Sequence, residues 1–262
     1  MKTNRFFTIL TIGLVAVALA TSCKDDDDES LPPIGGYNNS DEIGATDLVA
    51  HWPLNGNGKE MKSATMPEGT VGASYVTGIK GQALSLASGY LAYPAIPALS
   101  TTTGNMTISL WAKLTNNGGT DGYPSVMFTL GRTGEWAGNI NFMAETGWRT
   151  AASDTLVMKG LVVIKNQDGS ANWQDIINSA NPSADDIAAG HVAHPNRNGG
   201  VMTHYVITWE ATTGMFKLYA NGVKISNPVW ETRGGGNPLA LNFFTPTRPI
   251  IGAFETVVSG TP

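Results

Sequence analysis

The sequence predicts an all-β protein whose antiparallel strands form a two-sheet sandwich, and three observations support this. In the stretch from Thr203 to Ile225, every second residue of two runs is apolar, which is typical of strands with one buried face. These residues are Tyr205, Ile207 and Trp209 in the first run, and Phe216, Leu218 and Ala220 in the second. Asn221-Gly222 then favours the positive φ angles of a tight hairpin. Only 14% of the residues are charged and 31 of 262 are glycine, a composition typical of turn-rich β proteins.

The charge distribution disfavours nucleic acid as a partner. The formal net charge of the chain is −5, but from Asp47 onward there are 14 acidic and 13 basic residues, a net charge of −1. The excess acid therefore lies before the predicted domain. A nearly neutral domain has no electrostatic basis for binding nucleic acid.

Residues 1–22 have the features of a secretory signal peptide. Lys2 and Arg5 precede an apolar run from Phe6 to Ala20, which is too short for a comfortable membrane span. The run ends just before Cys23, the single cysteine, so no disulfide within one chain is expected.

Ala20-Thr21-Ser22-Cys23 resembles a relaxed bacterial lipobox, with Ala20 in place of the more usual leucine. The resemblance implies cleavage before Cys23 and diacylation of its thiol, which would anchor the protein to a membrane. The alternative is plain secretion with a free Cys23 thiol.

Residues 23–46 are predicted to be a flexible tether. Asp25 to Glu29 form an acidic run that resembles the export signal of some Gram-negative lipoproteins displayed on the outer face of the outer membrane. The alternative, which is compatible with the first, is a solvated charge run that keeps a linker extended. We therefore expect an outer-membrane lipoprotein exposed at the cell surface, with one domain over residues 47–262.

The first half of the domain contains several predicted strands. Leu48 to Leu54 is expected to be the opening strand, and it ends near Pro53 because proline cannot donate to a ladder. Three further short strands are predicted at Ala83–Leu86, Tyr90–Tyr93 and Met106–Lys113. Trp111 points away from the buried face of the last of these and is a further candidate for contact with a ligand.

The second half contains two strand regions and an insertion. Pro124–Leu130 and Asn139–Ala144 are predicted to pair across a loop at 131–138, and Leu161–Lys165 is predicted to be a buried strand. The spacing of Trp173, Ile176 and Ile177 predicts a short helix over 173–178. A second short helix is predicted over 181–188, with Asn181 as N-cap, Pro182 at the first position and two aspartates near its start. This insertion, near 172–190, is either functional or a lid over a sheet edge.

Five segments occur in the order found in a known family. They are Leu48-Val-Ala-His-Trp-Pro-Leu-Asn-Gly-Asn-Gly58, Gly78-Ile-Lys-Gly-Gln-Ala-Leu-Ser-Leu86, Gly104-Asn-Met-Thr-Ile-Ser-Leu-Trp-Ala112, Lys217-Leu-Tyr-Ala-Asn-Gly222 and Pro249-Ile-Ile-Gly-Ala253. From about Asp47 to Phe254 the chain resembles the laminin-G-like, concanavalin A-like jelly-roll domains of secreted and surface proteins. The resemblance implies a jelly-roll sandwich.

In that family a final strand follows the last segment and closes the sandwich beside the opening strand. Here the sequence stops at Thr261-Pro262. We therefore expect either that these 262 residues are a fragment of a longer product or that Glu255–Val258 and the tether partly cover the gap. The strand Leu48–Leu54 should lack a ladder partner on one side.

The resemblance also implies a loop near a calcium site at Asn55-Gly-Asn-Gly58. Asn55, Asn57 and Glu60 are weak candidate ligands, because the acidic ligand usual in the family is replaced by Lys59-Glu60-Met61-Lys62. The alternative is an ordinary solvated turn without any metal.

Catalytic patterns are mostly missing from the sequence. Glycosidases of the concanavalin A-like family carry paired carboxylates on one strand, but no Glu-x-Asp-x-x-Glu pattern occurs here. No Gly-x-Ser-x-Gly elbow occurs either. His191 and His194 have the spacing of a metal pair only if they lie on a helix, and Pro195 argues against a helix.

The tryptophans supply the candidate binding residues. Trp52 and Trp209 are expected in the core because they lie on apolar faces. Four others lie in or beside glycine-rich loops, where an indole can stack on a sugar ring: Trp136, Trp148, Trp173 and Trp230. The alternative for each is structural packing of its loop.

Three functions follow from these observations and stay open. The first is a non-catalytic surface lipoprotein that binds carbohydrate or a glycoprotein. The second is a glycoside hydrolase or lyase of the same fold. The third is an adhesion or assembly subunit that binds a protein partner.

Overall fold

The computed structural model describes residues 44–100, 104–119, 122–178 and 183–260. The predicted signal peptide, Cys23 and the tether up to residue 43 lie outside these described residues. The chain divides into two units, Met1–Leu48 and Val49–Pro262. In the first unit Gly44 to Asp47 form a turn. The sandwich belongs to the second unit.

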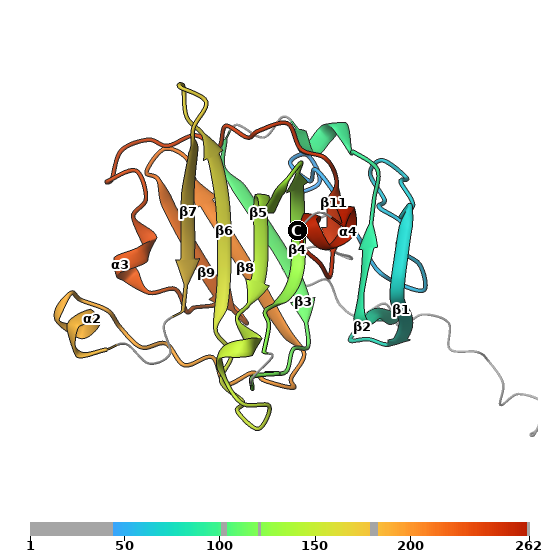
Figure 1. The fold of residues 1–262 in the computed structure, drawn as a ribbon, viewed down its shortest axis with the longest axis horizontal. Coiled ribbons are helices and arrows are strands. Elements are labelled where there is room, and N and C mark those ends of the chain that lie inside the picture. Colours follow the sequence, from blue (N-terminus) through green and yellow to red (C-terminus); the bar gives the residue numbers. More distant parts are fainter. Residues whose placement is uncertain (1–43, 101–103, 120–121, 179–182, 261–262) are drawn as a thin grey trace, which may run out of the picture. The chain divides into compact units, whose positions relative to one another are not determined.

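The larger sheet has seven strands in the order β1-β2-β11-β4-β5-β6-β7 (Figure 1). Their bounds are Gly69–Thr77 (β1), Gln82–Ala92 (β2), Pro249–Ile251 (β11), Ser125–Arg132 (β4), Glu135–Ala144 (β5), Met158–Lys165 (β6) and Ala171–Ile177 (β7). All neighbouring pairs in this sheet are antiparallel.

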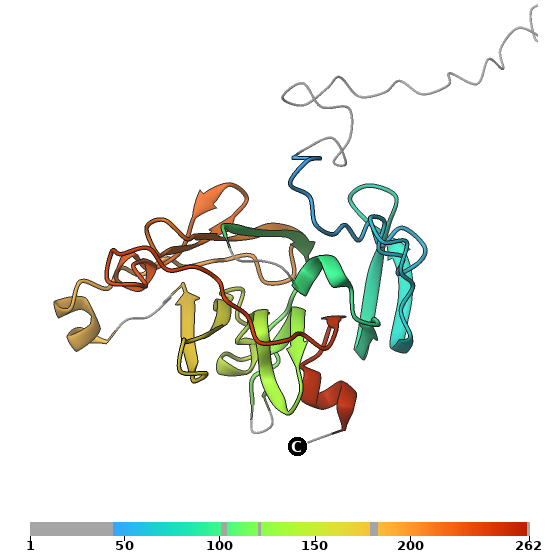
Figure 2. The ribbon, with the colours of Figure 1, turned by 90° about the horizontal axis from the view of Figure 1, so that it is seen from above.

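The smaller sheet has four strands in the order β10-β9-β8-β3, which are Val223–Lys224, Met215–Ala220, Thr203–Glu210 and Met106–Ala112. The predicted meander is confirmed, since β8 pairs with β9 and β9 with β10. Asn221 and Gly222 form the second turn with φ values of 48° and 78°, because both residues tolerate the left-handed region. Figure 2 shows the two sheets as two layers, with orange β8 and β9 in one layer and yellow-green β5 to β7 in the other.

The core lies between the two sheets, where the inward side chains of both meet. The largest fully buried side chain is Trp209, and its indole Nε1 donates to the carbonyl of Leu239 at 2.9 Å. Trp52 packs against this core with its ring 5.8 Å from those of Tyr93 and Phe128. Both tryptophans expected in the core are therefore found there.

The helices of the described residues are short. They are the 3-10 turns η2 (Pro97–Ser100) and η3 (Thr146–Trp148), and the helices α2 (Ala184–Ala188), α3 (Pro228–Glu231) and α4 (Glu255–Ser259). None of the helices in the described part of the chain is long and apolar enough to cross a membrane. The predicted antiparallel two-sheet jelly-roll sandwich with a few short helices is confirmed.

The predicted opening strand is wrong, because Leu48 to Leu54 is irregular. Pro53 has no N–H to donate to a ladder, and Leu54 has a positive φ of 55°. The first strand of the structure is β1, and the two strands predicted at Ala83–Leu86 and Tyr90–Tyr93 form the single strand β2.

Two further assignments in the middle of the chain need correction. Residues 171–177 form β7 and not the predicted helix, since Ala171 to Ile177 pair with β6 along their whole length. The predicted loop at 131–138 is a tight hairpin, because β4 extends to Arg132 and β5 begins at Glu135. The predicted second helix is confirmed over Ala184–Ala188, while Asn181 and Pro182 lie outside the described residues.

The C-terminal segment also differs from the expectation. β11 pairs on one side with β2 and on the other with β4, so it lies inside the larger sheet. After it, Glu255 to Ser259 form α4, which packs against β4 and β5. The expected unpaired side of Leu48–Leu54 does not arise, since this segment is no strand.

Candidate functional site

Trp136 and Trp173 lie together on one surface of the larger sheet. Their ring centroids are 5.9 Å apart, and 40% and 42% of their surfaces are exposed. The ring of Phe254 meets Trp136 edge-on at 5.2 Å. We call these three side chains the aromatic row. Trp136 lies on β5, Trp173 lies on β7, and Phe254 is the residue before α4.

The strand register places Trp173 on the outer face of the larger sheet, the face turned away from the smaller sheet. Ile176 of β7 is fully buried in the core between the sheets, so Trp173, three residues away, points to the opposite face. Trp173 pairs with Val163 of β6, which belongs to a separate apolar cluster outside that core. The exposed indole of Trp173 is thus displayed on a regular strand.

The start of β5, close to Trp136, is distorted. The β4–β5 register shifts between Leu130 and Arg132, and Gly138 has a φ of 61°. A Cβ atom at Gly138 would lie 2.3 Å from the carbonyl oxygen of Leu130, so only glycine fits at this bulge. Trp136 stands two residues before this bulge.

Two buried polar side chains fix the third ring. Asn141 Nδ2 donates to Thr129 Oγ1 at 3.1 Å, and the Thr129 hydroxyl donates to the carbonyl oxygen of Ala253 at 2.9 Å. This chain of bonds holds the backbone just before Phe254 against β4 and β5. Phe254 is therefore positioned by the sheet itself.

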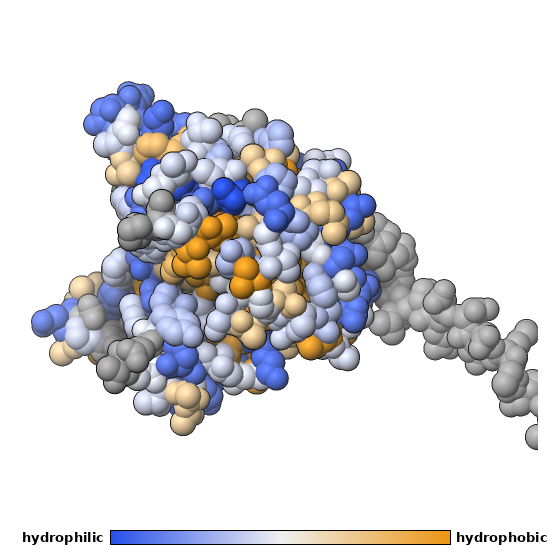
Figure 3. Space-filling view, turned by 45° about the vertical axis from the view of Figure 1, so that its right-hand side comes forward, coloured by the Kyte–Doolittle hydropathy of each residue, from blue (hydrophilic) through white to orange (hydrophobic). Residues whose placement is uncertain are grey.

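Next to the aromatic row lies a small apolar cluster bordered by charged groups. Leu161 and Val163 of β6 are buried there with Ala137 and Phe244. Figure 3 shows one face of the molecule, on which apolar residues form a small group with hydrophilic residues around them.

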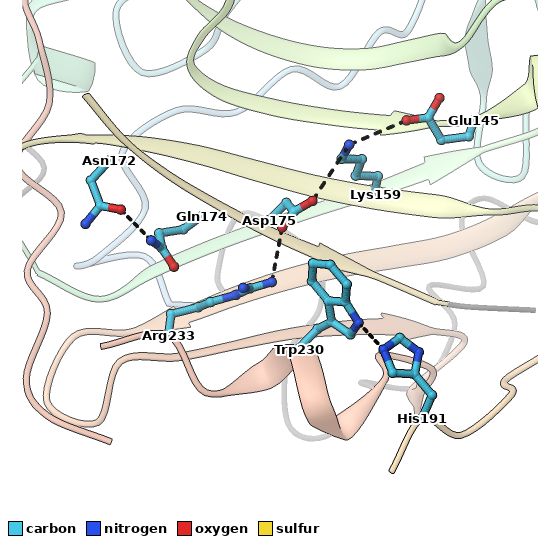
Figure 4. Close-up of polar contacts among 8 residues, drawn as sticks. All are labelled: Glu145, Lys159, Asn172, Gln174, Asp175, His191, Trp230 and Arg233. Carbon is cyan, nitrogen blue, oxygen red and sulfur yellow. Dashed lines mark hydrogen bonds and ion pairs between the residues drawn. The ribbon is translucent and has the colours of Figure 1, made fainter. Parts of the chain in front are cut away.

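Charged side chains on the same outer face form a network around Asp175, shown in Figure 4. Lys159 Nζ lies 3.7 Å from the carboxylate of Glu145 and 3.8 Å from that of Asp175. Arg233 reaches Asp175 from the other side at 3.2 Å. Burial raises the pKa of the Glu145 carboxyl, although Lys159 opposes this, and burial lowers the pKa of the Arg233 guanidinium, although Asp175 opposes it.

The structure does not bring the other two predicted tryptophans to this row. Trp148 is 63% exposed but follows β5 at the opposite end from Trp136. Trp230 is half-buried against the main core, donates from Nε1 to His191 Nε2 at 2.6 Å, and has the Arg233 guanidinium 5.1 Å from its ring centroid. Trp230 therefore has the contacts of a packing residue.

One more exposed tryptophan lies on the smaller sheet. Trp111 is 56% exposed and stacks on His204 at 5.1 Å, and His204 Nε2 is 2.7 Å from the Ser109 hydroxyl. Burial lowers the pKa of the His204 imidazole. Trp111 points away from the core as predicted, but it is the only exposed one among the described tryptophans of this sheet.

The side-chain oxygens of the three candidate calcium ligands accept hydrogen bonds from the chain itself. Both Glu60 carboxylate oxygens are used, because they accept from the backbone N–H groups of His51, Lys62 and Ser63 and from the Ser63 hydroxyl at 2.5–2.9 Å. The side-chain oxygens of Asn55 and Asn57 likewise accept from Gln82 N and Lys59 N. We assign these residues to loop structure, and within the described residues no group of three or more acidic, histidine or cysteine side chains could hold a metal.

His191 and His194 do not form a site either. They lie in an irregular segment, and both ring nitrogens of His191 already contact Trp230 and Asn227.

Sequence reasoning missed Phe254 and the charged groups of the outer face. Phe254 becomes part of the row only through the fold of α4, and no local pattern marks it. Asp175 could have been found, because alternation through residues 171–177 places it on the same face as Trp173.

No family model and no curated protein sequence matches the chain. Among solved structures, it is similar to domain 4 of AbnA, a GH43 extracellular arabinanase from Geobacillus stearothermophilus in complex with arabinotriose. That match has 18% identity and a TM-score of 0.41, and covers 82% of this chain and 96% of the other. The CBM40 of the Ruminococcus gnavus IT-sialidase, bound to α2,3 sialyllactose, has 12% identity and a TM-score of 0.32, with 72% and 90% covered. A tetrameric galectin from Cinachyrella sp. has 16% identity and a TM-score of 0.27, with 62% and 87% covered. Likenesses of this size define neither a family nor a ligand, so the function has to be argued from the residues of this chain.

Proposed function

We propose that this protein is a surface lipoprotein, anchored through Cys23, whose jelly-roll domain binds carbohydrate without catalysis of its own. The observation that carries the binding function is the aromatic row, in which two half-exposed indoles lie side by side on a rigid sheet.

The physical basis is the match between an exposed indole and the apolar face of a sugar ring. Holding large aromatic surfaces in water is unfavourable, and a sugar stacked on them would cover that surface. The charged groups of Lys159, Asp175 and Arg233 lie on or reach the same face and offer hydrogen bonds to hydroxyl groups. Because the rings stand on β5 and β7 and not on free loops, little ordering is needed on binding.

A glycan array with the purified protein tests the proposal, followed by affinity measurements on the best ligand. We expect Trp136→Ala and Trp173→Ala each to lower the affinity by about fivefold or more, taking the value of about 1–3 kcal/mol for a base stacked on an aromatic side chain. Trp111→Ala and Trp148→Ala are the controls, because these indoles are more exposed than those of the row but lie elsewhere. If Trp111→Ala is the variant that loses affinity, the site lies on the smaller sheet.

A glycoside hydrolase is the second candidate, and one observation favours it. Glu145 and Asp175 face Lys159 from two sides, and the raised pKa of Glu145 is a property of a general acid. It ranks second because Lys159 occupies the space between the two carboxylates, as Figure 4 shows. Release of reducing sugar by the purified protein, abolished by Glu145→Gln or Asp175→Asn, would establish hydrolysis. Retention of intact glycan would support binding alone.

The third possibility is a protein partner without glycan. Capture of a protein that survives complete enzymatic deglycosylation and requires Trp136 would replace the carbohydrate proposal.

A further inference from the structure

Beside the aromatic row, the surface is hollowed at one end of the larger sheet. The hollow measures about 450 Å³ and is lined by the β4–β5 turn from Arg132 to Glu135, by Lys165 at the end of β6, and by Phe244 and Thr245. We call it the basic hollow.

Two cations and one carboxylate face this hollow. The Arg132 guanidinium lies 4.1 Å from the centre of the Phe244 ring and pairs with Glu135 at 3.0 Å. Lys165 Nζ lies 5.8 Å from the same ring, and within the described residues Lys165 has no ion-pair partner. The two cations and one carboxylate therefore give the lining a net charge of +1. An anion bound between the two cations would neutralise this positive charge.

The backbone under the hollow is held firmly. Lys165 N donates to Asn242 O at 2.7 Å, and Asn242 Nδ2 donates back to Lys165 O at 2.8 Å. Asn139 clamps Phe244 in the same reciprocal way, at 2.9 and 3.1 Å. These two clamps fix the lysine backbone and the ring before any ligand arrives, which reduces the cost of binding.

The basic hollow and the aromatic row share one surface. Phe244 of the hollow packs against the cluster that includes Val163, and Val163 is the ladder partner of Trp173. Lys165 lies two residues after Val163, whose partner across the ladder is Trp173, so its side chain leaves β6 on the same face as Trp173. A ligand stacked on the indoles can therefore extend into the hollow.

We propose that the carbohydrate bound by this protein is anionic, with a carboxylate or sulfate group of the sugar held in the basic hollow by Lys165 and Arg132. This inference rests on the proposed carbohydrate-binding function and adds the class of ligand. A uronic acid and a sulfate ester offer the same chemistry here, namely anionic oxygens on a sugar ring.

Two pairs of polysaccharides that share a backbone separate charge from sugar. Polygalacturonate is compared with its fully methyl-esterified form, and dextran sulfate with dextran, by affinity electrophoresis with the purified protein. We expect the anionic member of at least one pair to bind more tightly, and its binding to weaken as salt is raised. The pair that shows the difference identifies carboxylate or sulfate.

Lys165→Ala is the main variant, because Lys165 has no ion pair whose loss would disturb the fold, and Arg132→Gln is the second. Each is expected to lower the affinity for the anionic polymer by up to about fivefold, as is usual for one exposed charge, without changing the affinity for the neutral one. Lys80→Ala is the matched control, because Lys80 is also an exposed lysine and lies in the β1–β2 turn, far from Lys165 in the sequence. A thermal melt of each variant shows that it is folded.

The outcomes distinguish this inference from the proposed function. Equal binding of charged and neutral polymers that still requires Trp136 overturns the anionic ligand and leaves carbohydrate binding standing. The same holds if Lys80→Ala weakens anionic binding as much as Lys165→Ala, since the effect would then be one of general charge. If none of these polymers and no glycan of the array binds, both fail.

Discussion

At the scale of single residues, Glu60 shows how a buried charge can serve structure. Its side chain is fully buried and its two oxygens accept four hydrogen bonds from His51, Lys62 and Ser63. Burial alone would raise the pKa of this carboxyl, but the hydrogen bonds from Ser63, His51 and Lys62 outweigh burial and lower it. The ionised form is therefore the one that the loop after Trp52 requires.

We predict that Glu60→Gln destabilises the protein by about 2–3 kcal/mol, because the amide nitrogen would face backbone donors and leave them unpaired. Glu68→Gln is the control, since Glu68 is half-exposed and its ion pair among the described residues is with Arg248, and a change of about 0.5 kcal/mol or less is expected there. Urea unfolding measures both. Equal effects of the two substitutions would contradict the structural role of Glu60.

The lowered pKa of Glu60 also fixes the direction of a pH effect. A carboxyl group whose pKa is lower in the folded state adds stability above its unfolded pKa of about 4.3, and this is lost as pH falls through the folded value. The difference in unfolding free energy between wild type and Glu60→Gln should therefore shrink as the pH is lowered below about 5. A difference that grows on acidification would show that the pKa is raised.

Calcium provides a further test at this scale. Because the oxygens of Asn55, Asn57 and Glu60 already accept backbone hydrogen bonds, we predict that calcium chloride and EDTA leave the melting temperature unchanged. A ligand that binds only the folded state raises the melting temperature with concentration. Such a rise, abolished by Asn57→Ala, would restore the calcium site.

At the scale of elements, the backbones of β1 and β2 approach each other at Gly89 so closely that a side chain would not fit there. At Gly89 an added Cβ atom would lie 2.1 Å from the carbonyl oxygen of Val71, next to the register shift between Val71 and Ala73. We predict that Gly89→Ala costs at least about 1–3 kcal/mol, the usual range for overpacking. At Gly104 an added Cβ atom meets no described residue within 4 Å, so Gly104→Ala should be nearly neutral in the same thermal melt. A neutral Gly89→Ala would mean that the hairpin can shift.

Local pattern was sufficient for some elements and misleading for others. Strands β4, β6, β8 and β9 were predictable because alternation and turn residues agree in them. In residues 173–178 the apolar residues satisfy a helical spacing, but pairing with β6 decides for a strand, where Trp173 and Asp175 share a face. The candidate site followed only in part, since the meeting of Trp136, Trp173 and Phe254 depends on strand order and on the docking of α4.

At the scale of the whole molecule, the sandwich was predictable from composition and from five ordered segments, but its closure was not. The short strand β11 lies between β2 and β4 and thereby joins the β1–β2 hairpin to the rest of the larger sheet. Such a contact between distant parts of the chain has no local signal, because the partners of a three-residue strand are chosen by space left in the sheet. The irregular path of residues 48–54 was likewise not predictable from local pattern.

The last prediction concerns attachment of the whole protein to a membrane. Each methylene of an acyl chain buried in a bilayer contributes about 0.8 kcal/mol, so several chains on Cys23 would hold the domain stably through its tether. We predict that Cys23→Ala removes palmitate incorporation and, when residues 1–22 are replaced by an ordinary cleavable secretory signal, releases the protein into the soluble fraction. The replacement is needed because an uncleaved apolar run from Phe6 to Ala20 could itself retain the chain.

Ser30→Ala in the tether is the matched control and should leave both labelling and membrane fractionation unchanged. Palmitate labelling that persists in the Cys23→Ala protein, or a membrane fraction that the double change does not reduce, would remove the lipoprotein proposal while leaving the binding surface of the domain to be judged by its own experiments.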